Sequence, residues 1–121
     1  MVERVKERRG KPRVESNLGA EIRAGEKSIV ATVKNMSESG LLLVTDHAVK
    51  ELTLVGLKLA LPPESPHSPR IAFEIQGAIV RCAKIAKSKP ARWEVAVFMT
   101  GIPQDAKLAL HDYIQGRLLH G

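Results

Sequence analysis

Apolar residues alternate with polar ones through most of the chain between residues 18 and 99. Apolar side chains at every second position are typical of a β-strand with one buried face. The stretches that show this spacing lie near residues 18–22, 29–33, 55–61, 71–82 and 93–99. A further stretch, Leu41–Val44, is continuously apolar, which favours a strand buried on both faces.

Turn-forming segments separate these stretches. Gly25 lies in a short segment, Ala24–Lys27, that suits a hairpin turn. The segment Pro62–Pro69 contains four prolines, which excludes the interior of a strand or helix and predicts an exposed loop. The alternation changes phase at Gly77, which predicts a β-bulge or a bend there. Six short strands with tight connections favour an antiparallel barrel or sandwich.

Residues 103–118 follow helical spacing instead. Pro103 suits the first position of a helix, and Asp105 in the first turn is favourable to the helix dipole. The apolar positions are Ala106, Ala109, Leu110, Tyr113, Ile114 and Leu118. This spacing predicts one amphipathic helix that packs on the strands.

Composition narrows the class of protein. A chain of 121 residues forms one domain, and with four aromatic residues its core must be aliphatic. Cys82 is the single cysteine, so no intramolecular disulfide forms, and we expect it to be a small core residue. The N-terminus has no apolar h-region and no apolar run is long enough to span a bilayer. We therefore expect a cytoplasmic protein without membrane insertion.

Two polar motifs carry the candidate chemistry. The first is Arg8-Arg9-Gly10-Lys11-Pro12-Arg13, which contains the pattern R-x-x-x-R from Arg9 to Arg13. The second is Asn35-Met36-Ser37-Glu38-Ser39-Gly40, of the form N-x-S-x-x-G, between two predicted strands. A solvated basic tail and a simple turn are the alternative interpretations of the two motifs. The net charge of +6 favours either an anionic partner or solubility alone.

Together, in this order and ahead of short strands and a closing helix, the two motifs resemble the PilZ family. PilZ domains are small bacterial β-barrels that bind the second messenger cyclic di-GMP. The resemblance covers nearly the whole chain. It implies a six-stranded antiparallel β-barrel with a C-terminal α-helix packed on it, over residues 8–119, after a mobile N-terminal tail of residues 1–7.

The resemblance also implies the ligand contacts. Arg9 and Arg13 would hold phosphates and guanine edges, which suits the planar, forked guanidinium. Asn35 and Ser37 would also contact the ligand, with Gly40 at the start of the next strand. Residues two apart in an extended chain face the same way, so we expect the side chains of Asn35 and Ser37 to do so.

Two more arginines are candidates for the same ligand. Arg8 directly precedes the R-x-x-x-R pattern. Some PilZ domains with arginine at this position bind two intercalated ligand molecules, so Arg8 suggests that stoichiometry. Arg81, on the fifth predicted strand, is a further ligand candidate, with an exposed strand arginine as the alternative.

The sequence therefore predicts a cyclic di-GMP receptor that orders its arginine segment on the ligand and signals to a separate effector protein. The alternatives are a PilZ-like adaptor that binds protein without ligand, and a basic nucleic-acid-binding barrel. Nucleic acid is the less expected partner because aromatic stacking platforms are scarce. The pathway, whether motility, adhesion or polysaccharide export, is not specified by the sequence, and the oligomeric state stays open, a ligand-bridged dimer included.

We expect no catalytic site, no cofactor and no metal. The four histidines have no metal-ligand spacing, and the chain has no P-loop and no G-x-G-x-x-G pattern. A protein that receives a signal needs none of these.

Overall fold

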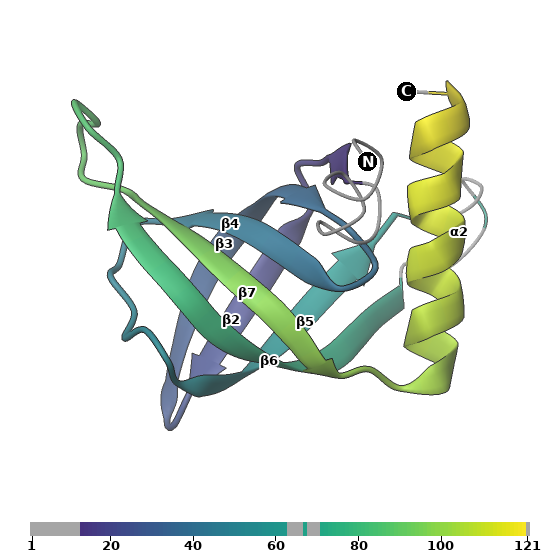
Figure 1. The fold of residues 1–121 in the computed structure, drawn as a ribbon, viewed down its shortest axis with the longest axis horizontal. Helices are drawn as coiled ribbons and strands as arrows, with labels where there is room; N and C mark the ends of the chain where they lie inside the picture. The colour runs from purple at the N-terminus through teal and green to yellow at the C-terminus, as the bar shows by residue number, and fades with distance from the viewer. Residues whose placement is uncertain (1–12, 63–66, 68–70, 121) are drawn as a thin grey trace, which may run out of the picture.

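The computed structural model describes residues 13–62, 67 and 71–120, and these form a barrel of strands beside one long helix (Figure 1). The predicted mobile tail, residues 1–7, lies outside the described residues. The elements are β1 (Val14–Glu15), β2 (Gly19–Ala24), β3 (Lys27–Met36), β4 (Gly40–Thr45), β5 (Leu54–Leu61), β6 (Ile71–Lys84), β7 (Trp93–Gly101) and α2 (Gln104–His120).

All strand pairs are antiparallel, and the sheet closes on itself. The seven strands follow the order β1-β3-β2-β5-β6-β7-β4, and an additional pairing of β3 with β4 closes the ring. β1 pairs with β3 alone, at the mouth of the barrel. The remaining six strands form the closed barrel, which confirms the predicted six-stranded antiparallel barrel with a C-terminal helix.

The core inside the barrel is aliphatic, as the scarcity of aromatic residues predicts. The largest fully buried side chains come from every strand of the barrel and from α2, and they are Ile22, Val33, Met36, Leu41, Leu43, Leu57, Leu59, Ile75, Ile79, Val95, Leu110 and Ile114. Cys82 is partly buried and packs against this core.

β4 differs from its predicted burial on both faces. Leu41 and Leu43 are buried, whereas Leu42 and Val44 are only half-buried. The barrel has an inside and an outside, so alternate residues of even a continuously apolar strand face outward. Leu42 and Val44 therefore belong to the outer surface of the barrel.

Two bulges bend β6 against β7. The register shifts between Gln76 and Gly77, which confirms the predicted irregularity at Gly77, and shifts again between Ile79 and Arg81. A Cβ at Gly77 would lie 2.6 Å from Cγ1 of Val97, so only glycine allows this close approach. The second bulge was not predicted, and it sets which β6 residues face outward beyond it.

α2 stands beside one end of the barrel and packs on it through one face (Figure 1). Ala106, Leu110 and Ile114, four residues apart, are buried there. Leu118 differs from the prediction because it is 45% exposed. The last turns of α2 rise beyond the strands (Figure 1), and Leu118 is not among the described hydrophobic residues that pack against the core. Among the described residues, no helix combines the length and the apolar character needed to cross a bilayer.

Candidate ligand-binding site

The structure brings one residue of each motif into direct contact. Nε–H of Arg13, just before β1, donates a hydrogen bond of 2.9 Å to Oδ1 of Asn35, near the end of β3. The pairing of β1 with β3, which places Glu15 opposite Asn35, holds the two segments together. Because this bond uses Nε, it leaves the terminal nitrogens of the Arg13 guanidinium and the amide nitrogen of Asn35 to donate to other groups.

Ser37 is buried and shapes the turn of the second motif. Its Oγ accepts hydrogen bonds of 3.2 Å from the N–H groups of Ser39 and Gly40, and its own N–H donates to the Gly40 carbonyl at 2.9 Å. The expectation that Asn35 and Ser37 face the same way assumed an extended chain through residue 37, but the two residues differ in their surroundings. β3 ends at Met36, and Ser37 is 1% exposed while Asn35 is half-buried.

Gly40 lies at the point where the second motif meets β7 and Arg13. It pairs with Phe98 of β7, and the Met99 N–H donates to the Ser39 carbonyl at 2.9 Å. A Cβ at Gly40 would lie 3.0 Å from the Val97 carbonyl oxygen and 3.9 Å from Nη1 of Arg13. The absence of a side chain therefore lets the turn lie close to the backbone of β7, with the Arg13 guanidinium next to it.

Arg81 lies on the same outer surface, in line with Asn35. Strand pairing runs from Asn35 to Leu42, from Leu42 to Ala96 and from Ala96 to Arg81. Three strand spacings separate the ends of this row, which is about 14 Å. The structure thus gathers Arg13, Asn35 and Gly40 in one cluster and places the exposed Arg81 across the face from it. Arg8 and Arg9 lie outside the described residues.

A charged pair and a shallow hollow border the cluster. Nζ of Lys34 lies 2.8 Å from Oε2 of Glu94, and this ion pair crosses over the outer side of β4. Beyond it a hollow of about 530 Å³ extends along β3 and β4, with Lys34, Val44, Asp46 and Arg92 among its lining residues. Among the described residues, the cation that is hydrogen-bonded to Asn35 is Arg13, whereas Lys34 is paired with Glu94.

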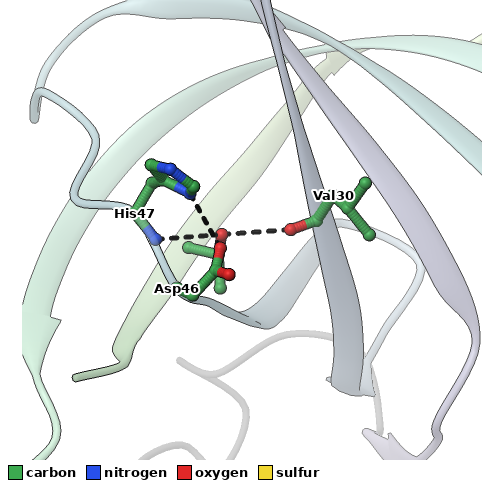
Figure 2. Close-up of polar contacts among 4 residues, drawn as sticks. Val30, Asp46 and His47 are labelled. Atoms are coloured by element: carbon green, nitrogen blue, oxygen red, sulfur yellow. Dashed lines mark hydrogen bonds and ion pairs between the residues drawn. The ribbon is translucent and has the colours of Figure 1, made fainter. Parts of the chain in front are cut away.

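At the opposite end of β4, polar contacts join the strand to β3 and to the segment that follows β4. The Thr45 hydroxyl donates to the Val30 carbonyl at 3.1 Å and accepts from the His47 N–H at 3.4 Å (Figure 2). His47 also contacts the neighbouring Asp46 carboxylate at 2.7 Å, but both side chains are exposed. Among residues 13–62, 67 and 71–120, no group of three or more His, Cys, Asp or Glu side chains is placed to hold a metal ion.

Comparison with known sequences decides the family. The sequence pattern of the PilZ domain matches residues 7–116. The chain belongs to the PilZ domain family. A comparison with curated proteins gives no match.

Solved structures with the same fold include proteins from three bacteria. The inhibitor of motility MotI/DgrA of Bacillus subtilis aligns with a TM-score of 0.75 at 21% identity, over 91% of this chain and 51% of that one. The PilZ domain of YcgR from Escherichia coli, solved with c-di-GMP, aligns at 0.69 and 9% identity, over 93% and 92%. PlzA of Borreliella burgdorferi, in complex with c-di-GMP, aligns at 0.61 and 13% identity, over 98% and 56%. The chain thus spans about half the length of MotI/DgrA and PlzA.

In this PilZ domain, α2 contacts both parts of the candidate site. Oε2 of Glu38, inside the second motif, lies 3.1 Å from Nδ1 of His111 on α2. Nη2 of Arg117 donates to the Glu15 carbonyl, two residues after Arg13, at 2.9 Å. The Ser16 and Tyr113 hydroxyls lie 3.0 Å apart. Sequence reasoning missed these contacts because each joins residues far apart in the chain.

Proposed function

We propose that the protein is a receptor for cyclic di-GMP and that the ligand binds on the outer face of the barrel beside Arg13, Asn35 and Gly40. Membership of the PilZ family and the contact between the two motifs support this assignment. The observation that carries it is the Arg13–Asn35 hydrogen bond, because it joins the R-x-x-x-R segment to the N-x-S-x-x-G turn. A guanidinium fork beside an amide suits a phosphodiester or a guanine edge.

The arginine segment would close on the ligand as it binds. Arg8 and Arg9 would then join Arg13 around the phosphates and guanines, with Arg81 reaching the ligand from β6. A ligand that interacts better with the closed arrangement shifts the population toward it. The ligand stabilises the closed arrangement by the difference between its binding free energies to the closed and open arrangements.

The signal would pass to a separate protein through α2. The segment that follows Arg13 contacts α2 through Glu15 and Ser16, and the second motif contacts it through Glu38. A shift of either segment would therefore change its contacts with α2. The side of α2 away from the barrel carries exposed leucines, Leu108 and Leu119, at which an effector protein can bind.

We expect backbone amide NMR signals of Asn35 and Gly40 to move when cyclic di-GMP is added, and those of His111 and Tyr113 on α2 to move with them. The first pair reports contact with the ligand, and the second pair reports transmission through the helix. Signals of Ser28 and Lys58, at the other end of β3 and on β5, serve as the control and should stay in place.

Three results would contradict different parts of the proposal. No movement at saturating ligand would exclude the receptor function. Movement restricted to β2 and β5 would refute the location of the site. Movement at Asn35 and Gly40 without any on α2 would leave the binding site standing and refute transmission through the helix.

A further inference from the structure

Phe98 is an aromatic side chain on the outer surface of the barrel. It lies in the middle of β7 and is 53% exposed, whereas the flanking Val97 and Met99 are buried. The other aromatic residues, Phe73, Trp93 and Tyr113, are half-buried. Phe98 is therefore the aromatic ring that this protein offers most fully to a ligand.

The neighbours of Phe98 on both adjacent strands are small. It pairs with Gly40 on β4 and with Ala78 on β6. A cross-strand neighbour normally covers part of an outward-facing ring, since paired Cβ atoms lie about 4.5–5.5 Å apart. Glycine has no side chain and alanine has only a methyl group, so neither neighbour covers the ring of Phe98.

The same glycine connects Phe98 to the arginine of the candidate site. A Cβ at Gly40 would lie 3.9 Å from Nη1 of Arg13, and Gly40 is the direct partner of Phe98. The backbones of Phe98 and Gly40 are therefore one strand spacing apart, about 4.8 Å. The Arg13 guanidinium lies next to Gly40. The hydrogen bond from the Met99 N–H to the Ser39 carbonyl fixes the turn and β7 relative to each other.

We propose that Phe98 is a base-stacking residue of the cyclic di-GMP site, on which one guanine of the ligand lies flat. This inference rests on the function proposed above and adds a contact outside both motifs. Arg13 holds the phosphate or the edge of a base, while the ring of Phe98 offers its face to a purine in the offset-stacked arrangement that aromatic systems prefer. Val80, 50% exposed, and Leu54, 78% exposed and paired with Ala78, extend an apolar border beyond the ring.

Titration calorimetry with cyclic di-GMP on Phe98 variants tests the stacking. We expect Phe98→Ala to weaken binding by about 5- to 150-fold, which corresponds to base–aromatic stacking of about 1–3 kcal/mol. Phe98→Leu keeps an apolar side chain but no aromatic face and should weaken binding nearly as much, while Phe98→Trp should bind at least as tightly as the natural protein. Val30→Ala shortens another exposed apolar side chain, 76% exposed on β3, and should leave the affinity unchanged.

A spectroscopic signature separates stacking from simple apolar contact. The fluorescence of a tryptophan at position 98, measured against the natural protein with its single Trp93, should be quenched when cyclic di-GMP binds. Natural protein that binds cyclic di-GMP, with Phe98→Ala and Phe98→Leu binding equally well, would overturn the stacking role alone. Emission of the Phe98→Trp protein that is unchanged at saturation would overturn it too. Failure of the natural protein to bind would instead refute the receptor function on which the inference rests.

Discussion

Replacing Arg13 with alanine is expected to lower the affinity for cyclic di-GMP by about 10- to 150-fold while the barrel stays folded. The guanidinium is the charged group placed beside Asn35 and Gly40, and one hydrogen bond to a charged partner is worth about 1.5–3 kcal/mol. Arg13 is exposed and precedes the first strand, so its loss should change the free energy of unfolding by less than about 0.5 kcal/mol. Titration calorimetry and thermal unfolding measure the two effects separately.

The matched control for this variant is Arg23→Ala. Arg23 is also an exposed barrel arginine with a nearby hydrogen-bond partner, Glu21, but it lies on β2. Its removal lowers the net charge by the same amount and should leave the affinity unchanged. Equal losses in the two variants would mean that general positive charge attracts the ligand, and normal binding by Arg13→Ala would place the site elsewhere.

Gly40→Val is expected to weaken both folding and binding. The added Cβ would lie 3.0 Å from the Val97 carbonyl oxygen, a backbone atom that moves only with β7. Overpacking of this kind destabilises a protein by about 1–3 kcal/mol. The methyl groups of valine would also occupy the space next to Nη1 of Arg13, so we expect an affinity loss comparable to that of Arg13→Ala. Chemical unfolding and calorimetry give the two quantities.

Gly19→Val provides the comparison for this effect. Gly19 lies at the start of β2, and no atom lies within 4 Å of a Cβ built on it. This variant should be as stable as the natural protein and should bind normally. If Gly40→Val matched Gly19→Val in both measurements, the close approach of Arg13 to the barrel at Gly40 would not matter for the ligand.

Much of the barrel can be predicted from the sequence because its signals are local. Alternation of apolar residues along each strand reports the inside and outside of the barrel without knowledge of which strands pair. The phase change at Gly77 marks a real shift in register. The same alternation in β7, with Val95, Val97 and Met99 facing inward, already implied that Phe98 faces outward.

The remaining features depend on contacts between distant residues. The burial of Ser37 follows from the N–H groups of Ser39 and Gly40, which need an acceptor in a turn that β7 covers. The contact between Glu38 and His111 joins positions 73 residues apart, and no local pattern reports it. The short strand β1 was not predicted either, because Val14–Glu15 has too few residues for a period to show.

The most direct test of the receptor function is isothermal titration of the purified protein with cyclic di-GMP at physiological salt, with GTP and cyclic di-AMP as controls. We predict saturable binding of cyclic di-GMP with micromolar or tighter affinity, about −8 kcal/mol or better, and no comparable binding of the controls. The measured stoichiometry will also distinguish one ligand from the two that Arg8 suggests. The absence of binding heat, together with an unchanged melting temperature at high ligand concentration, would contradict the receptor function and leave the protein-binding adaptor in its place.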